Sequence, residues 1–388
     1  MDAKTAAQRV VSDAGSGLVE LSHTVHDHPE LAFEEERAAA WVADALSGPF
    51  SVEAGVCDLP TAFVATAGSG PFTIAICAEY DALPGIGHAC GHNVIAAAAV
   101  GAGLALAPIA DELGITVKVM GTPAEEKGGG KILMLQRGAF AGVHAAMMVH
   151  PSSNDDNDHM PCLAIQDFEV HYHGKAAHAS AFPELGLNAA DALTIAQTSI
   201  GLLRQHIKHS DRIHGIVLHG GDAPNVVPHE TAGRWYVRSK NMAQLAELEP
   251  RVVRCFEAGA LATGCTVDVV KAGPAYSEFE HDKGLAALYR ANAEALGRKF
   301  VDLPEEIAQR FAGSTDMANI SLAMPAIHPM LGLDCFPAVN HQPEFTAACV
   351  TPKADQAVID GAIGMAWTVI DAATDDATRA RLMAGQRA

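Results

Sequence analysis

The sequence is poor in basic residues, and this shortage limits the kinds of partner that the protein can bind. Its 388 residues include 26 lysines and arginines but 46 aspartates and glutamates, which gives a formal net charge of −20 at neutral pH. Such an excess of negative charge repels the phosphate backbone of nucleic acids and the surface of anionic membranes. We therefore expect neither of these partners.

Long hydrophobic runs are also missing. The only membrane-like segment, "VIAAAAVGAGLALAPIA" at residues 94–110, consists mostly of alanine and glycine. A membrane span needs roughly 20 strongly apolar residues, so this segment predicts a buried helix instead. The N-terminal segment "MDAKTAAQRVVSDAGSGL" lacks the apolar core of a secretory signal, and we therefore expect a cytoplasmic protein.

The cysteines lack the close spacing of disulfide and zinc frameworks. None of the eight belongs to a CxxC pair: Cys57, Cys77, Cys90, Cys162, Cys255, Cys265, Cys335 and Cys349. In a long chain with no export signal, this spacing predicts reduced thiols, seven of them in the core. Cys90 is the exception, because it lies two positions before His92 in the stretch "EYDALPGIGHACGHN" at residues 79–93.

What is present is an alternation of apolar and amphipathic segments. A chain of this length exceeds the usual size of a single domain, so two domains are expected. Residues 1–166 and 282–388 alternate strands with helices, which predicts an α/β domain with a mostly parallel sheet flanked by helices. Residues 167–281 follow the order strand, helix, strand, strand, helix, strand, which predicts an inserted ferredoxin-like α+β domain.

Side chains that bind metals follow the predicted parallel strands. Cys90 and His92 come after one strand, Glu125 and Glu126 after the next, and His150 after a third. The carboxyl ends of parallel strands meet at one edge of a sheet, so these side chains are expected to converge. Adjacent glutamates diverge, so one can bind a metal while the other takes up a proton. Thiolate, imidazole and carboxylate together suit zinc best, with manganese, cobalt and nickel as alternatives.

Each of these residues has a plainer explanation when it is taken alone. A single histidine is usually solvated or hydrogen-bonded, two glutamates before a lysine usually form a charged turn, and a lone cysteine usually belongs to the core. Only the joint placement favours a metal site. A phosphate-binding loop is excluded, because Lys131 in "EEKGGGKI" is followed by isoleucine rather than by the serine or threonine that binds magnesium.

Eight segments, taken together and in order, resemble a known family. They are "HDHPELAFEE", "AEYDALPGIGHACGHN", "GTPAEEKGGGK", "MMVHP", "GKAAHASAFPELGLNAADA", "NVVPHETAGRWYVR", "GSTDMANIS" and "NHQPEF". The sequence is similar to the dinuclear-metal aminoacylase and glutamate-carboxypeptidase metallopeptidases of peptidase family M20. Within the family it resembles the amidohydrolase branch that contains aminobenzoyl-glutamate, hippurate and auxin-conjugate hydrolases. The resemblance implies a catalytic α/β domain with an inserted lid or dimerisation domain.

The resemblance also implies roles for nine residues. Two divalent ions per subunit would be bound by five of them: Cys90, His92, Glu126, His150 and His341. Glu125 would be the general base, and His178 of the inserted domain would polarise the scissile carbonyl, often from the partner subunit of a homodimer. Asn225 and Arg238 would bind the substrate. The alternative for Arg238 is that it is a surface arginine on an edge strand without a role in binding.

The expected function is metal-dependent hydrolysis of the amide bond in N-acyl, aminobenzoyl or aminoacyl amino acids, by an activated water and Glu125. A dipeptidase or carboxypeptidase acting on short peptides is one alternative, and an inactive metal-binding scaffold is another, although Glu125 and His178 are both retained. One departure concerns Asn93, since many relatives have aspartate directly after the CxH element, where it influences metal affinity. His328, before Pro329, is expected to be structural, with substrate contact as the alternative.

Overall fold

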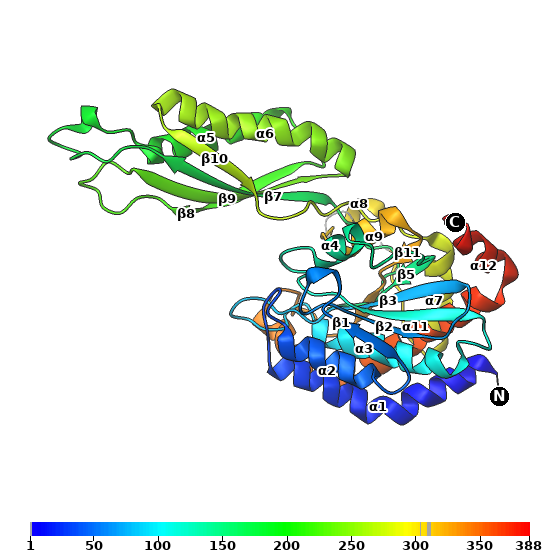
Figure 1. The fold of residues 1–388 in the computed structure, drawn as a ribbon. Helices are drawn as coiled ribbons and strands as arrows, with labels where there is room; N and C mark the ends of the chain where they lie inside the picture. The colour runs from blue at the N-terminus through cyan, green and yellow to red at the C-terminus, as the bar shows by residue number, and fades with distance from the viewer. Residues whose placement is uncertain (1, 303, 309–311) are drawn as a thin grey trace. The chain divides into compact units, whose positions relative to one another are not determined.

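The computed structural model describes residues 2–302, 304–308 and 312–388, and the chain forms two compact units (Figure 1). The main unit comprises Met1–Pro161 and Phe279–Ala388, and the inserted unit comprises Cys162–Glu278. Each unit has its own sheet and its own hydrophobic core.

The main unit is built on a mixed sheet with the strand order β1-β2-β4-β3-β5-β11. Its strands are β1 (Ser51–Ala54), β2 (Phe63–Ala67), β3 (Phe72–Ala78), β4 (Ile115–Gly121), β5 (Ala145–Met147) and β11 (Ala326–Ile327). The pairs β4–β3, β3–β5 and β5–β11 are parallel, whereas β1–β2 and β2–β4 are antiparallel. The predicted mostly parallel α/β sheet is therefore confirmed, and the antiparallel edge was not foreseen.

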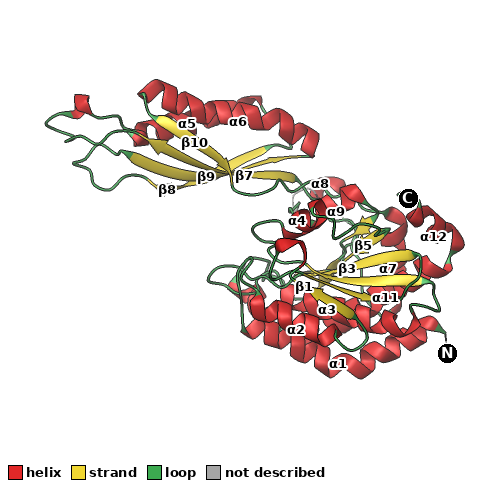
Figure 2. Cartoon of the chain, viewed as in Figure 1, coloured by secondary structure: helices red, strands yellow, loops and turns green. Residues whose placement is uncertain are grey.

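Both faces of this sheet are covered, which explains the nearly unbroken apolar character of β3. Ile74 and Ile76 pack into the larger core, whereas Ala75 and Cys77 point into the cluster on the other face. The larger core is formed with α1 (Ala3–Asp27), α2 (Glu36–Leu46), α3 (His92–Leu106), α7 (Lys283–Ala295) and α11 (Pro352–Thr374). The opposite cluster includes α4 (Gly130–Gln136) and α9 (Met317–Ala323) (Figure 2).

Shorter elements complete the main unit. They are η1 (Val56–Asp58), η2 (Ala107–Ile109), β6 (His150–Ser152), α8 (Glu305–Ala308), β12 (Met330–Gly332), α10 (Pro343–Ala348) and α12 (Asp376–Met383). His150 comes after β5 of the main sheet, as the sequence predicted, with two residues between that strand and the histidine. His150 opens β6, which pairs in parallel with β12 to form a separate two-stranded sheet.

In the part of the main unit that the structure describes, two stretches are long and apolar enough to cross a membrane by length and composition alone. One is residues 92–109, which contain α3, and the other is α11. In each case 78% of the stretch is buried inside the structure, which is the packing of a core helix. The alanines and glycines of α3 let neighbouring helices approach closely, since a Cβ at Gly101 would lie only 2.8 Å from Ala362 Cβ of α11.

The inserted unit is an antiparallel sheet with the order β10-β7-β9-β8, covered on one face by α5 and α6. Its elements are β7 (Ala164–His173), η3 (Pro183–Leu185), α5 (Ala189–Leu203), η4 (Arg204–His206), β8 (Arg212–His219), β9 (Glu230–Ser239), α6 (Met242–Thr263) and β10 (Thr266–Lys271). This chain order and this strand order together are the ferredoxin-like plan. The α+β part of the predicted fold class is thus confirmed.

Candidate active site

The loop between β3 and α3 presents Cys90 and His92 on either side of a glycine that cannot be replaced without strain. Gly91 has φ +77°, and a Cβ there would lie 2.8 Å from Pro151 Cγ and 3.2 Å from Cys349 Sγ. Glycine is therefore required both by backbone conformation and by space. It allows the chain to turn into α3, whose first residue is His92.

His92 is fully buried, and its two ring nitrogens have different surroundings. Nδ1 lies 2.8 Å from the carbonyl oxygen of Asp81 and 3.0 Å from Asp81 Oδ1. Nε2 has no hydrogen-bond partner among the described residues, yet it faces Glu79 Oε2 at 3.4 Å and Glu125 Oε2 at 3.8 Å. Burial alone would lower the pKa of His92, but the charge of Asp81 and the neighbouring glutamates raise it well above its usual value. A cation bound at Nε2 would balance the same carboxylates.

A strained turn after β4 presents the two adjacent glutamates. Ala124 has φ +60°, and its backbone N–H donates to Oε1 of buried Glu35 at 2.8 Å. The backbone N–H of Glu126 donates to Oδ2 of Asp81 at 2.9 Å. Burial, followed by the charge of Glu79, raises the pKa of Glu125 well above its usual value, and burial also raises the pKa of Glu126.

Among the described residues, three overlapping groups of side chains could each hold a metal ion. They are Cys90–His92–His150, Cys90–Glu126–His341 and Glu79–His92–Glu125, and within each group the ligand atoms lie within 4.8 Å of one another. Because Cys90 belongs to two groups and His92 to two, the groups describe neighbouring positions. The structure thus brings together all five predicted ligands and Glu125. Sulfur, nitrogen and carboxylate donors fit zinc and the late transition metals.

His341 is the exposed member of the set, with its side chain 61% exposed. Its backbone has φ +69°, and its N–H donates to the carbonyl oxygen of Ala89 at 2.9 Å, next to Cys90. Its Nε2 lies 3.7 Å from Glu126 Oε2. A long-range backbone contact therefore fixes the histidine that is farthest from the others in sequence.

The remaining three predicted residues belong to the inserted unit. His178 Nδ1 accepts hydrogen bonds from the backbone N–H groups of Ser180 and Ala181, at 3.3 and 3.2 Å. The segment around His178 pairs with the segment around Asn225, whose carbonyl oxygen accepts from the N–H of Ala179 at 3.0 Å. His178 and Asn225 are thus neighbours.

Arg238 lies at the other end of the inserted sheet from these two residues. It pairs with Ile165, near the start of β7. β7 ends at His173, which pairs with Glu230, and His178 follows five positions later in the chain. Glu230 and Arg238 are eight positions apart on β9, which at about 3.3 Å per residue separates them by roughly 26 Å. One copy of the inserted unit therefore does not gather all three side chains around one small substrate.

Two residues singled out in the sequence have other surroundings. Asn93 is fully buried, and its Nδ2 donates to Ser22 Oγ and to the carbonyl oxygen of Cys349, both at 2.9 Å. Its amide thus joins α3 to distant segments of the core. His328 is 5% exposed, and its ring lies 5.3 Å from that of His150, centroid to centroid. Burial lowers the pKa of His328 well below its usual value, so this ring is neutral.

Several residues that shape the site were not among the predicted site residues. They are Glu35, Glu79, Asp81, Lys131 and Asp316, all buried. Asp81 and Glu79 lie in the same stretch as Cys90, and their carboxylates after an apolar strand were the available signal. Nothing in the local sequence indicates that Lys131 pairs with Asp316, 185 positions away.

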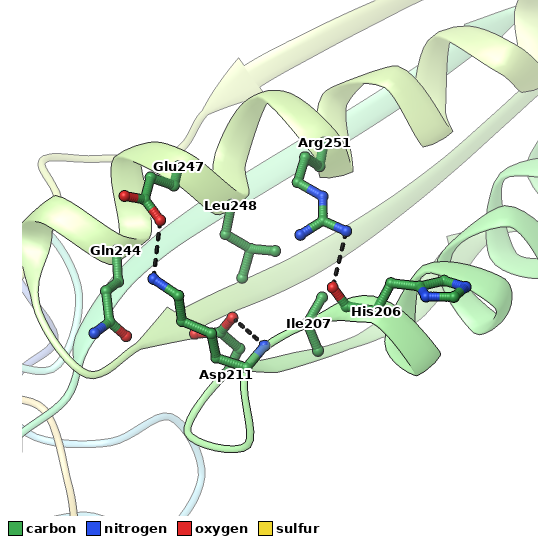
Figure 3. A pocket seen from close by; sticks show the side chains of 8 residues that line it. His206, Ile207, Asp211, Gln244, Glu247, Leu248 and Arg251 are labelled. Atoms are coloured by element: carbon green, nitrogen blue, oxygen red, sulfur yellow. Dashed lines mark hydrogen bonds and ion pairs between the residues drawn. The ribbon is translucent and has the colours of Figure 1, made fainter.

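A hollow in the inserted unit is lined by none of the predicted site residues (Figure 3). Two of its charged side chains form hydrogen bonds with other residues of the same hollow. Lys208 Nζ donates to Glu247 at 2.9 Å, and Arg251 donates to the carbonyl oxygen of His206 at 3.0 Å. Asp211 Oδ1 and Gln244 Oε1 in its lining have no hydrogen-bond partner in the described part of the chain, but none of its residues belongs to the groups of described side chains that could hold a metal ion.

Comparison with known proteins agrees with this geometry. A sequence profile described as "Peptidase family M20/M25/M40" matches residues 75–355. The chain is 38% identical to the mouse protein named Xaa-Arg dipeptidase over 95% of its own length and 88% of that protein's. It is 35% identical to one of the proteins that make up the p-aminobenzoyl-glutamate hydrolase of Escherichia coli K12, over 64% of this chain and 56% of that one.

Two solved structures share the fold. An aminobenzoyl-glutamate utilization protein from Klebsiella pneumoniae has a TM-score of 0.70 at 21% identity and covers 88% of this chain and 96% of its own. A dinuclear metal-binding M20 peptidase from Bacillus subtilis has a TM-score of 0.68 at 20% identity and covers 93% of this chain and 99% of its own. The family predicted from the sequence is confirmed: this chain belongs to peptidase family M20/M25/M40 and is a hydrolase that acts on amide or peptide bonds.

Proposed function

We propose that the protein is a metal-dependent hydrolase that cleaves the amide bond of small substrates ending in a free amino-acid carboxylate. The observation that carries this proposal is the convergence of Cys90, His92, Glu126, His150 and His341, with Glu125 beside His92. Two divalent ions bound there, zinc in the first place, would polarise the scissile carbonyl and lower the pKa of a water molecule.

The chain's own side chains divide the remaining tasks. Glu125 takes the proton of the attacking water and delivers it to the leaving amine. Asp81 holds His92 through Nδ1, so that Nε2 faces the other ligands. His178 and Asn225 contact the reacting amide, and Arg238 binds the substrate carboxylate through paired hydrogen bonds.

The substrate of the proposed reaction is an N-acyl amino acid or a dipeptide. Dipeptides are the second candidate, and they are favoured by the relatives named Xaa-Arg dipeptidase in mouse and human, at 38% and 34% identity over 95% of this chain. Hydrolysis of a panel tests both: N-acetyl amino acids, hippurate, indoleacetyl-aspartate, aminobenzoyl-glutamate, β-alanyl dipeptides and dipeptides ending in arginine. Preference for the last two classes supports a dipeptidase, and turnover of none of these amides by the metal-loaded protein contradicts the proposal.

The proposed enzyme is a homodimer that forms through the inserted unit. Within one copy, roughly 26 Å of β9 separates Arg238 from the start of that strand, which follows the paired segments of His178 and Asn225 in the chain. Joint action of these three side chains on one substrate therefore needs two copies. β8 is an edge strand of the described sheet and carries exposed Ile216 and Leu218, 61% and 53% exposed. A strand edge of this kind pairs readily with a second strand.

Mixing two inactive variants tests the shared site. Glu125→Gln and His178→Ala chains, each inactive alone, should regain about a quarter of wild-type turnover in a random mixture, because half the dimers then contain one intact site. No recovery in demonstrated mixed dimers would contradict action in trans. The double substitution I216K/L218K should favour the monomer, whereas L261K, at an 88% exposed leucine of α6, is the matched control.

A further inference from the structure

Glu79 is a buried carboxylate to which the mechanism above gives no role. It directly follows β3, is fully buried, and forms an ion pair through Oε1 with Lys131 Nζ. Its other oxygen, Oε2, lies 3.4 Å from Nε2 of His92. Neither this oxygen nor that nitrogen has a hydrogen-bond partner among the described residues. Two unsatisfied, fully buried atoms thus face each other beside the predicted metal ligands.

The distance between these atoms suits two ligands of one ion. Donor atoms about 2.0–2.2 Å from a tetrahedral ion are separated from each other by roughly 3.3–3.6 Å. Glu125 Oε2 lies 3.8 Å from the same nitrogen, and the three side chains form one of the groups whose ligand atoms lie within 4.8 Å. A cation at this position would satisfy both orphaned atoms at once.

Lys131 and Asp316 hold Glu79 in place. Lys131 Nζ lies 2.8 Å from Asp316 Oδ1, and the backbone N–H of Lys131 donates to Asp316 Oδ2 at 2.9 Å. All three side chains are fully buried, and Lys131 supplies one positive charge to two carboxylates. A cation between Oε2 of Glu79 and Nε2 of His92 would supply the second positive charge.

We propose that Glu79 is an additional metal-binding side chain of this centre, which shares an ion with His92 and is oriented by Lys131. The inference rests on the proposed function, because it assumes that His92 binds a metal. The competing explanation is that Glu79 only balances the charge of Lys131. In that case Glu79 and Asp316 have equivalent tasks, since each pairs with the same ammonium group.

This equivalence provides a matched pair of variants. Glu79→Gln leaves Lys131 paired with Asp316, and Asp316→Asn leaves Lys131 paired with Glu79, so each variant retains one buried ion pair. We would titrate the metal-free proteins with Co²⁺, follow the visible spectrum of the bound ion, and count bound metal by elemental analysis. Glu79→Gln should bind one of the two ions at least roughly tenfold more weakly and shift its spectrum, whereas Asp316→Asn should resemble the wild type.

Equal affinities and spectra for Glu79→Gln and wild type would overturn the inference, as would equal losses in both variants. The Cys90→Ser variant tests whether the predicted ligands bind metal at all, independently of Glu79. If wild type binds two ions and Cys90→Ser loses binding while Glu79→Gln does not, only the role of Glu79 is refuted. If wild type binds no ion, the proposed function fails as well.

A second variant covers the outcome in which Glu79→Gln does not fold. Glu79→Asp keeps the charge opposite Lys131 but withdraws the carboxylate by one methylene group. It should fold and still bind one ion more weakly than wild type, with an altered cobalt spectrum. Wild-type affinity and spectrum in folded Glu79→Asp would contradict the inference.

Discussion

Asp81 Oδ1 lies 3.0 Å from Nδ1 of His92, and both side chains are buried. The other oxygen of Asp81 accepts the backbone N–H of Glu126 at 2.9 Å. One carboxylate therefore orients a predicted ligand from the β3–α3 loop and fixes the turn that carries the two glutamates. A histidine that donates its second N–H to a carboxylate is typical of metal sites, because the contact sets the ring orientation and raises ligand basicity.

Replacement of Asp81 by asparagine should weaken metal binding. In wild type the two oxygens of the Asp81 carboxylate contact Nδ1 of His92 and the backbone N–H of Glu126. An asparagine side chain has no charge and only one oxygen, so it cannot accept a hydrogen bond from both groups. We expect metal affinity to fall by roughly 10- to 100-fold, as for other residues that orient metal ligands, while the protein stays folded. Competition with a chromophoric chelator measures the affinity, and circular dichroism checks the fold. Unchanged affinity would show that Asp81 does not orient His92.

Asn93→Asp should destabilise the protein even though many relatives have aspartate at this position. A carboxylate cannot donate to the carbonyl oxygen of Cys349, which the Asn93 amide reaches at 2.9 Å. Leaving that acceptor unpaired next to a buried charge should cost at least about 1–3 kcal/mol. Urea unfolding measures the loss, and Ser22→Ala, which removes only the second partner of Asn93, should cost less. An Asn93→Asp protein as stable as wild type would contradict this assignment.

Glu35 should make stability depend on pH in a defined direction. Burial, followed by the charge of Asp81, raises the pKa of Glu35 from 4.5 to about 7. Between these values the native chain retains a proton that the unfolded chain has lost. The contribution of Glu35 to stability therefore falls by roughly 3 kcal/mol as pH rises through this window.

Glu35→Gln isolates this contribution, because the glutamine oxygen can still accept the N–H of Ala124 while its side chain does not titrate. The free energy of unfolding of the variant, relative to wild type, should increase by roughly 3 kcal/mol between pH 4.5 and pH 8. Parallel pH profiles for the two proteins would mean that Glu35 titrates normally.

Much of the fold was predictable, because its main strands and helices have clear patterns. The apolar runs of β3 and β4 indicated strands buried on both faces, and the structure places core clusters on both. The hairpin of β1 and β2 was missed because both strands are short and β1, at the sheet edge, is mostly exposed. For such strands, pairing with the neighbour decides the structure more than local sequence does.

The site was predictable where its residues follow strand ends, and not where they depend on tertiary pairing. Cys90, His92 and the two glutamates were identified from their positions in sequence, and the structure brings them together. The buried pair of Lys131 and Asp316 joins segments 185 positions apart, and only the folded chain reveals it. The separation of Arg238 from His178 likewise follows from strand register, which motifs do not report.

The most direct test of the account compares Glu125→Gln with wild type in metal content and in turnover of the amide panel. Glu125 is assigned the proton transfer, so the account predicts two bound ions per chain in both proteins and a turnover lower by on the order of a hundredfold or more in the variant. Wild-type turnover by Glu125→Gln, or full activity of the wild-type protein after complete removal of metal, would contradict the central claim.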